Sequence, residues 1–387
     1  MMEHYVYLDN AATTFPKPEA VYTAMDNTNR NYAVNAGRGA YAKAQCANEI
    51  IVKTKKALRK LIGADNNVPV VFCPSITVAL NQIINGLELT ENSFVYYSPY
   101  EHNAVARTLN YLVKRKKIHL RELPIDDSTG EIEIHKLSYM FSKENPSAVF
   151  CTHVSNVTGY VLPVDEIFTE SKKYNSINVL DTAQSLGLVE YDIRRNKGVD
   201  VLAFAGHKSL YGPFGIGGFI NISNIPLKEF IVGGTGSDSL NLEMPQDDEA
   251  KYECASSNIV SISGLLAALQ VLNVSEIYKH EKDMTRYLVD RLQELKNIKL
   301  FAPSNKERHI GIVSFAVEGY KSEDVGMILD EDFNIAVRTG YHCAPFIHSH
   351  LNDAKYSGTV RVGISQFTKR EEIDALVEAL TDLQEVV

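Results

Sequence analysis

Long apolar runs and targeting signals are both missing from this sequence. None of its 387 residues belongs to a run approaching the roughly 18–20 apolar residues that span a bilayer. The N-terminal segment MMEHYVYLDNAATTF has no basic region followed by an apolar one, so it predicts no secretory signal. Internal repeats and low-complexity tracts are also absent. We therefore expect a chain that works in the cytoplasm.

Cysteine is sparse, and positive charge is not in excess. The five cysteines (positions 46, 73, 151, 254 and 343) form no paired framework, which indicates free thiols in a reducing compartment. The net charge of −9, without a long basic run, argues against nucleic acid or a membrane as the main partner. A small anionic ligand stays possible, because a phosphate site is local. The length allows two domains.

Short apolar runs alternate with helical patterns between Val68 and Ile222. Such runs predict a mainly parallel sheet with helices on both faces, and ligands bind such sheets at the carboxyl ends of the strands. The expected strands are VPVVFC (68–73), SFVYYS (93–98), KIHLREL (117–123), SAVFCTH (147–153), INVLD (177–181), VLAFA (201–205) and GGFINI (217–222).

The pattern changes after a long helical stretch, 263–295, for which we expect a break near Val274. HIGIVSFAV, a helix near 322–330, NIAVRT, TVRVGIS and a final helix from Arg370 then predict a compact α+β unit. We place the domain boundary near 270–280. The segment 231–253 has the length of a functional loop.

The segment FAGHKSLYGPFGIGG (204–218) places Lys208 directly after a strand. An amine there could form an imine with an aldehyde cofactor, and His207 could contact a phosphate. The alternative is an exposed lysine in a glycine-rich turn. Asp181 closes the preceding strand, where a carboxylate could face a pyridine nitrogen, although it could also cap a helix or bind a metal.

Three further candidates follow strands. His102 opens a helix and could stack on a cofactor or act as an acid or base, or it could be a surface histidine. Asn156 also lies just past a strand. Arg361, inside the apolar strand GTVRVGIS, needs a bidentate partner, which could be a substrate α-carboxylate or an internal carboxylate.

A cysteine with cationic neighbours lies in NIAVRTGYHCAPFIHSH (334–350). Arg338 and His342 near Cys343 could lower the pKa of its thiol and make it nucleophilic. Cys343 could instead be an inert buried residue. His342, Cys343, His348 and His350 could also form a metal site, but their spacing fits no common zinc pattern.

Six motifs in one order carry a family resemblance that covers nearly the whole chain. They are LDNAATT, the EH pair at 101–102, HVSN (153–156), DTAQ (181–184), GHK (206–208) and RTGYHCA (338–344). Together they resemble the cysteine desulfurase and selenocysteine lyase family of class V, fold-type I pyridoxal-phosphate (PLP) enzymes. The short RTGxHCAP segment is similar to the branch in which the catalytic cysteine lies on a short, structured loop.

The resemblance implies an α/β fold with a large PLP-binding domain (15–270), built on a mainly parallel seven-stranded sheet. Residues 1–14 and 271–387 would form a smaller α+β domain. It also implies a homodimer, with Ser256 reaching the partner's phosphate and Arg38 near the cofactor.

The resemblance further implies a role for each matched residue. Lys208 would hold PLP as a Schiff base and Cys343 would accept sulfur. Asp181 would pair with the ring nitrogen of PLP, Gln184 would bind the ring hydroxyl, and His102 would stack on the ring. Thr77 and His207 would bind the phosphate. The substrate would be bound by Asn156, Arg338 and Arg361.

Two departures from the family pattern remove hydroxyls from the expected phosphate site. Ala205 and Ile76 stand where the family often has Ser or Thr, and Ser75 could compensate. At about 1 kcal/mol for a typical hydrogen bond, these losses would weaken PLP retention without abolishing it. One extra residue also follows the lysine, in KSLYGP.

The expected activity is conversion of L-cysteine to L-alanine, with a persulfide on Cys343 that passes to an acceptor. L-Selenocysteine is an alternative substrate, and a PLP C–S lyase or aminotransferase is an alternative activity. A non-catalytic metal- or sulfur-binding scaffold is the alternative from a different class.

Overall fold

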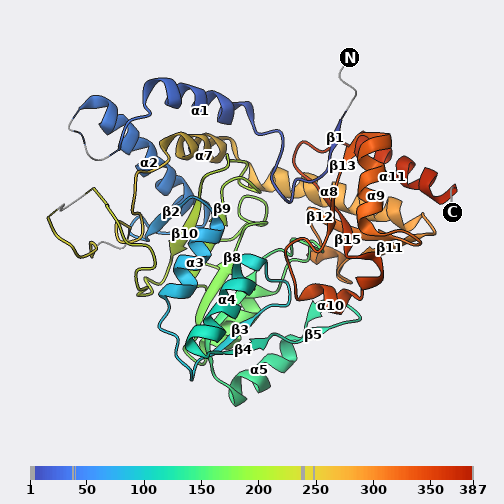
Figure 1. Ribbon diagram of the computed structural model, residues 1–387, viewed down its shortest axis with the longest axis horizontal. Coiled ribbons are helices and arrows are strands. Elements are labelled where there is room, and N and C mark those ends of the chain that lie inside the picture. Colours follow the sequence, from blue (N-terminus) through green and yellow to red (C-terminus); the bar gives the residue numbers. More distant parts are fainter. Residues whose placement is uncertain (1–4, 37–38, 40, 237–239, 247–248, 386–387) are drawn as a thin grey trace.

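The computed structural model describes residues 5–36, 39, 41–236, 240–246 and 249–385 (Figure 1). In chain order its elements are β1 (Val6–Tyr7), α1 (Glu19–Asn31), α2 (Ala42–Leu61), β2 (Val70–Cys73), α3 (Ile76–Gly86), β3 (Phe94–Tyr97), α4 (Asn103–Lys116), β4 (His119–Glu122), β5 (Ile125–Asp126), β6 (Glu131–Ile132), α5 (Ile134–Lys143), β7 (Pro146–Thr152), α6 (Val164–Lys172), β8 (Ile177–Asp181), β9 (Val201–Ala205), β10 (Gly217–Asn221), α7 (Ile259–Val271), α8 (Val274–Gln293), β11 (Ile298–Phe301), β12 (Ile312–Val317), α9 (Ser322–Phe333), β13 (Ile335–Ala336), β14 (Arg338–Gly340), α10 (Ile347–Leu351), β15 (Thr359–Gly363) and α11 (Arg370–Glu385).

A seven-stranded sheet with the order β2-β10-β9-β8-β7-β3-β4 forms the larger part of the chain. Only β10 runs antiparallel to its neighbours, so the predicted mainly parallel sheet is confirmed. Adjacent strand residues face opposite cores. Val70 and Leu180 pack with α2, α5, α6 and α7, whereas Val71 and Val179 pack with α3 and α4. Burial on both faces explains why these strands are apolar throughout.

The parallel strands end at one edge of the sheet, and this edge gathers the candidate residues. The segments after β2, β3, β7 and β9 carry Thr77, His102, Asn156 and Lys208, while Asp181 is the last residue of β8. Since parallel strands present their carboxyl ends together, residues far apart in the sequence meet there.

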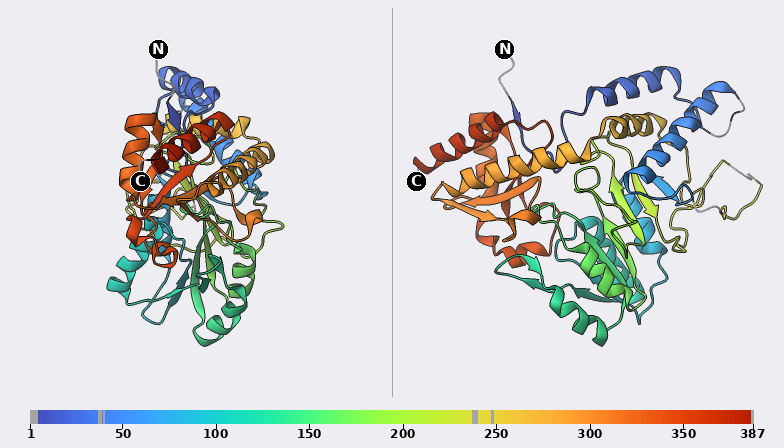
Figure 2. Two further views of the ribbon diagram at one scale, coloured as in Figure 1. Left: turned by 90° about the vertical axis from the view of Figure 1, so that its right-hand side faces the viewer. Right: turned by 180° about the vertical axis from the view of Figure 1, so that it is seen from behind.

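A second, four-stranded sheet with the order β11-β12-β15-β14 lies beside the large one (Figures 1 and 2). It buries a core of its own with α8, α9 and α11. The N-terminal strand β1 pairs in parallel with β13, so the start of the chain joins this C-terminal unit. The predicted break in the long helix is confirmed, because α7 ends at Val271 and α8 begins at Val274.

Several elements differ from the sequence-based expectation. Helices α1 and α2 were not predicted, nor were the short strands β5, β6 and β11. The described parts of 231–253 contain neither helix nor strand. Within the described ranges, no single helix could cross a membrane, although α7 and α8, bent by 81°, satisfy length and composition as a pair.

We predict that Gly217→Ala destabilises the fold next to the start of α3. A Cβ at Gly217 would lie 2.8 Å from the nitrogen of Ile76 and 2.9 Å from the carbonyl oxygen of Phe204, and neither backbone atom can move freely. Overpacking of this kind costs about 1–3 kcal/mol, measurable by urea unfolding. In the matched control Gly233→Ala, the nearest atom lies 3.7 Å away, and an equal loss in both variants would contradict this account.

Candidate active site

Lys208 lies in the turn that follows β9, where a close backbone approach fixes its position. A Cβ at Gly206 would meet the carbonyl oxygen of Ile216 at 2.7 Å, so the turn requires glycine. The carbonyl of Lys208 accepts hydrogen bonds from the nitrogen of Tyr211 and the hydroxyl of Thr14. No described carboxylate forms an ion pair with its amine. Burial lowers the pKa of Lys208 to about 8, against the opposing effect of Asp181.

Asp181 lies close enough to this lysine to raise its pKa, and Gln184 follows Asp181 by three residues. Asp181 is buried, and burial raises the pKa of its carboxyl, while Lys208 and a 2.8 Å hydrogen bond from the nitrogen of Ala183 oppose the rise. The side-chain nitrogen of Gln184 donates to the carbonyl of Ala11 at 2.8 Å. The side-chain oxygen of Gln184 can then accept a hydrogen bond from a ligand. The site therefore offers a buried carboxylate one strand away from an amine.

His102 caps helix α4 and is neutral. Its Nδ1 accepts a hydrogen bond from the nitrogen of Ala104 at 3.0 Å, which places the ring proton on Nε2. Burial, followed by the nearby charges of Lys208 and Arg338, lowers the pKa of His102 to about 3. The ring can therefore stack and donate from Nε2, rather than carry a charge.

The residues expected near a phosphate surround the start of α3 and the turn after β9. His207 stacks on Phe214 with ring centroids 4.6 Å apart, and its buried Nδ1 has no partner among the described residues. Ser75 caps α3 by accepting from the nitrogen of Val78 at 3.3 Å, so its hydroxyl is already engaged. Thr77 is exposed in the first turn of α3, where backbone N–H groups favour an anion.

Sequence reasoning missed a cation beside this region. Lys17 donates to the carbonyl of His207 and to the hydroxyl of Thr14, both at 2.7 Å. Burial lowers the pKa of Lys17 to about 7. Its position just after the LDNAATT motif was the available signal, but the motif alone does not show that it folds back onto His207.

Cys343 lies between β14 and α10, in a loop held at both of its central carbonyls. Asn156 donates to the carbonyl of His342 at 2.7 Å, and the nitrogen of Asn103 donates to the carbonyl of Cys343 at 2.6 Å. The Arg338 guanidinium donates to the Cys343 sulfur at 3.4 Å. This contact places a guanidinium directly beside the sulfur.

The expectation that His342 also supplies a cation is wrong. Its Nε2 lies 2.8 Å from the hydroxyl of Thr359, and the ring is buried. Burial, reinforced by Arg361, lowers the pKa of His342 to about 2, so the ring is neutral. Of the two neighbours, Arg338 alone carries the positive charge.

The histidines after Cys343 face protein acceptors instead of one another. His348 lies 2.5 Å from Asp353 and 2.9 Å from the carbonyl of Tyr341, and His350 contacts Asp127 and Glu122. Nowhere in the described ranges do three or more His, Cys, Asp or Glu side chains gather as metal ligands.

Arg361 is fully buried and forms the internal ion pair that the sequence left open. Its Nη2 lies 2.8 Å from Asp9, and its Nη1 donates to the carbonyl of Asn156 at 3.0 Å. Its Nε is buried without a partner among the described residues. Arg361 faces Arg338 across the β14–β15 pair, so two guanidiniums share this corner.

The two residues expected near a partner subunit differ in what the structure describes. Ser256 is exposed, and its hydroxyl accepts from the amide of Asn35 at 3.4 Å. Arg38 lies outside the described residues.

Comparison with known proteins identifies the family. The profile of the aminotransferase class-V family matches residues 6–376. The chain belongs to this family. It is 31% identical to a probable cysteine desulfurase of Pyrococcus abyssi, over 99% of this chain and 95% of the relative. A probable cysteine desulfurase of Halalkalibacterium halodurans is also 31% identical, over 98% of this chain and 93% of the relative. The apo cysteine desulfurase of Thermococcus onnurineus superimposes with a TM-score of 0.89 at 28% identity, covering 99% of this chain and 95% of that one.

Class-V aminotransferases and cysteine desulfurases are PLP-dependent, and the site of this chain fits PLP. Among the described residues, its primary amine has no ion pair, a buried carboxylate lies one strand away, and the buried Nδ1 of His207 has no partner. Lys208, Asp181 and His207 are the groups expected for the aldehyde, the ring nitrogen and the phosphate of the cofactor.

Glu101, the first residue of the EH pair, is a second residue for which the sequence predicted no role of its own. It is fully buried, and its Oε1 accepts from Ser98 at 2.5 Å and from the nitrogen of Thr152 at 2.6 Å. Its Oε2 has no partner among the described residues. Burial raises the pKa of Glu101 to about 8, so the carboxyl is neutral beside Asp181.

We predict that Glu101→Gln flattens the pH dependence of stability. A carboxyl whose pKa is raised to about 8 on folding stabilises the protein below its unfolded pKa of 4.5, and this contribution disappears as pH rises towards 8. The linkage is about 1.4 kcal/mol per pKa unit. The free energy of unfolding, measured from pH 5 to 8, should therefore fall less in Glu101→Gln than in the wild type. The exposed control Glu91→Gln should follow the wild type, and identical slopes in all three proteins would refute the neutral carboxyl.

Proposed function

We propose that this chain is a PLP-dependent cysteine desulfurase, which converts L-cysteine to L-alanine and receives the sulfur on Cys343. The observation that carries this proposal is the contact between Arg338 and the Cys343 sulfur, 3.4 Å apart, in the same site as the Lys208 amine. An aminotransferase would have no use for a thiol at this place. The cysteine desulfurases among the relatives support the same activity.

Lys208 is the residue that would hold the cofactor. When bound, PLP serves as an electron sink for the substrate α-carbon. With a pKa of about 8, the Lys208 amine can accept the α-proton and return a proton near neutral pH. Asp181 would keep the cofactor's ring nitrogen protonated, and neutral His102 would stack on the ring.

Cys343 would act as the nucleophile towards the substrate sulfur. Its sulfur forms a bond with the sulfur of L-cysteine as the substrate Cβ–S bond breaks, and the electron pair of that bond stays with the carbon. Protonation of that carbon completes L-alanine. The balance is L-cysteine plus the Cys343 thiol giving L-alanine plus the Cys343 persulfide, so no external oxidant is needed. Proximity makes this step possible.

The substrate carboxylate would bind at Arg361. Because Asp9 and the carbonyl of Asn156 each use one end of the guanidinium, its unpartnered Nε and its remaining N–H groups are available. Arg338, directly across the strand pair, adds positive charge. The guanidiniums of Arg338 and Arg361 carry two positive charges, and Asp9 balances one of them. The site therefore favours an anion.

We further propose that the protein belongs to the branch with a short, structured cysteine loop. The hydrogen bonds from Asn156 and Asn103 to the carbonyls of His342 and Cys343 support this assignment. A loop held in this way gives up its persulfide to a thiol acceptor that approaches the site, because the loop itself does not travel.

A cytoplasmic homodimer is the proposed working form. The exposed apolar side chains Leu240 and Leu242, at 96% and 99% exposure, lie in the long loop before α7. Exposed apolar side chains of this kind support an interface. Ser256, in the same loop region, would then reach the phosphate of the partner's cofactor.

We predict that Cys343→Ala abolishes persulfide formation and leaves cofactor binding intact. Lys208, Asp181 and His207 remain, so the cofactor absorbance near roughly 410–430 nm should persist. Alanine and sulfide production from L-cysteine should fall at least about 100-fold, since the nucleophile is lost. The exposed control Cys46→Ala should be unaffected. Alanine and sulfide formed by Cys343→Ala at the wild-type rate would disprove the role of Cys343.

Ser256→Ala should weaken PLP binding without changing the fold. Loss of one hydrogen bond to a phosphate costs about 1.5–3 kcal/mol, which corresponds to roughly tenfold or more in the Kd for PLP. The Kd is measured by titrating the apoprotein with PLP and following absorbance. Ser257→Ala, its exposed neighbour, is the control. Equal affinity in both variants would show that Ser256 does not reach a phosphate.

A further inference from the structure

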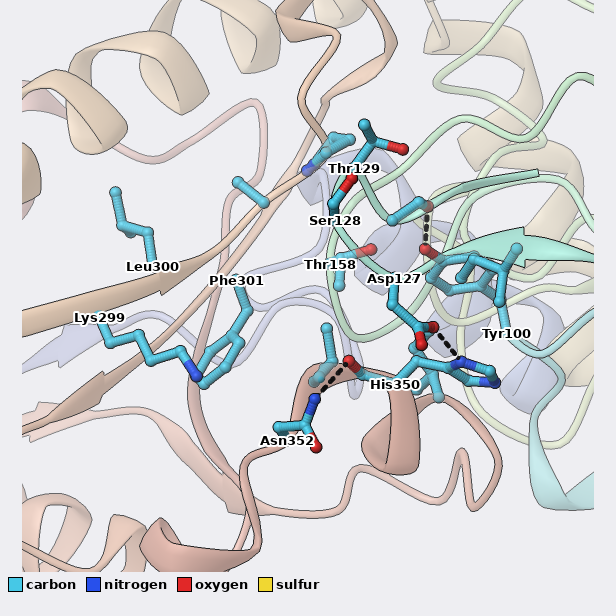
Figure 3. A pocket seen from close by; sticks show the side chains of 16 residues that line it. Tyr100, Asp127, Ser128, Thr129, Thr158, Lys299, Leu300, Phe301, His350 and Asn352 are labelled. Carbon is cyan, nitrogen blue, oxygen red and sulfur yellow. Dashed lines mark hydrogen bonds and ion pairs between the residues drawn. The ribbon is translucent and has the colours of Figure 1, made fainter. Parts of the chain in front are cut away.

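The short helix α10, which follows the Cys343 loop, carries a histidine whose two ring nitrogens both face carboxylates. His350 Nδ1 lies 2.6 Å from Asp127 and His350 Nε2 lies 2.9 Å from Glu122; Figure 3 shows the contact with Asp127. An ionised carboxylate only accepts hydrogen bonds. Both ring nitrogens must therefore donate, and His350 is an imidazolium in this arrangement.

These contacts join two separate units of the chain. Glu122 ends β4 of the seven-stranded sheet, and Asp127 directly follows β5. His350 comes instead from the C-terminal unit. The rings of Tyr97, on β3, and Phe346, just before α10, lie 4.7 Å apart and add an apolar contact. A cavity of about 300 Å³ borders His350 and Asp127, so the contact is the edge of an interdomain pocket.

A second histidine of α10 faces inward and holds the cysteine loop. His348 Nε2 lies 2.9 Å from the carbonyl of Tyr341, two residues before Cys343. His348 Nδ1 lies 2.5 Å from the buried Asp353, which fixes the ring. His348 thus connects α10 to the loop, and His350 connects α10 to the large sheet.

We propose that His350 is a positioning residue for Cys343. Its cation fastens α10 to Glu122 and Asp127, and α10, through His348, holds the Cys343 loop where Arg338 contacts the sulfur. The α10 brace is our name for His348, His350, Glu122 and Asp127. The catalytic part of this inference rests on the proposed sulfur-accepting role of Cys343; the structural part does not.

The surrounding charges set the direction of the pH response. Besides Glu122 and Asp127, the titratable groups that line the pocket with His350 are Tyr100 and Lys299, and Tyr97 on β3 lies near Glu122. Burial lowers the pKa of His350, but the hydrogen bonds and charges of Asp127 and Glu122 outweigh it, and the net shift is upward from 6.5. A histidine pKa raised on folding contributes its full effect below pH 6.5 and loses it as pH rises through the raised value. The brace should therefore loosen in alkaline solution.

Two substitutions separate the charge of His350 from its shape. His350→Lys keeps a cation throughout pH 6–9, whereas His350→Gln has none. In the PLP-loaded enzyme, hydrogen exchange of backbone amides in 341–353 should be at least about twofold faster in His350→Gln than in His350→Lys at every pH. The wild type should match His350→Lys at pH 6 and approach His350→Gln at pH 9.

The same proteins test whether the brace serves catalysis. At pH 6.5, His350→Gln should lower kcat for L-cysteine about threefold or more, with KM within about twofold, because the thiol and not the substrate is displaced. His350→Lys should restore kcat. The surface control His135→Gln, next to Glu133 and 75% exposed, should behave like the wild type. Cofactor absorbance should be equal in all four proteins.

Each contrary result has a distinct meaning. Equal exchange rates in the wild type and both His350 variants at all pH values would overturn the brace itself. Faster exchange in His350→Gln with an unchanged kcat would overturn the positioning role. If the wild type makes no alanine from L-cysteine, the proposed function fails, while the exchange comparison still decides whether the brace exists.

Discussion

The concentration of cations in a buried corner is the constraint on which this site depends. Lys208, Arg338 and Arg361 lie close enough that each arginine lowers the pKa of the lysine. Like charges that cannot be fully hydrated repel strongly, so the protein must supply anions or give up protons. Asp9 and Asp181 supply part of the balance, and the pKa of Lys208 falls to about 8. The same imbalance favours an anionic ligand.

Several ionisable side chains next to these cations are neutral. His102, His207 and His342 are all neutral, because burial and the nearby cations lower the pKa of each ring. Glu101 stays protonated because it is fully buried near Asp181. Of the groups that keep a charge, Arg338 contacts the Cys343 sulfur and Arg361 pairs with Asp9.

Two units of the chain build the site, so their relative placement matters for chemistry. The large sheet contributes Lys208, Asp181 and His102, whereas Cys343, Arg338 and Arg361 come from the C-terminal unit. Asn156 and Asn103 bind the cysteine loop across this boundary, and the α10 brace lies farther along the same boundary. These contacts join the two units around the Cys343 loop.

The sequence by itself determined the strands of the large, mainly parallel sheet and the set of candidate groups at its edge, but not the order of the strands. Buried parallel strands must be apolar throughout, and their ends must carry the polar residues, so both are visible in a local pattern. It did not predict α1 or α2. Tertiary structure alone decided which partners the charged groups find. Asp9 pairs with Arg361 across 352 residues, and His350 meets Glu122 across 228. It also decided that His342 is neutral, because burial and neighbouring charge depend on segments that a local pattern does not contain.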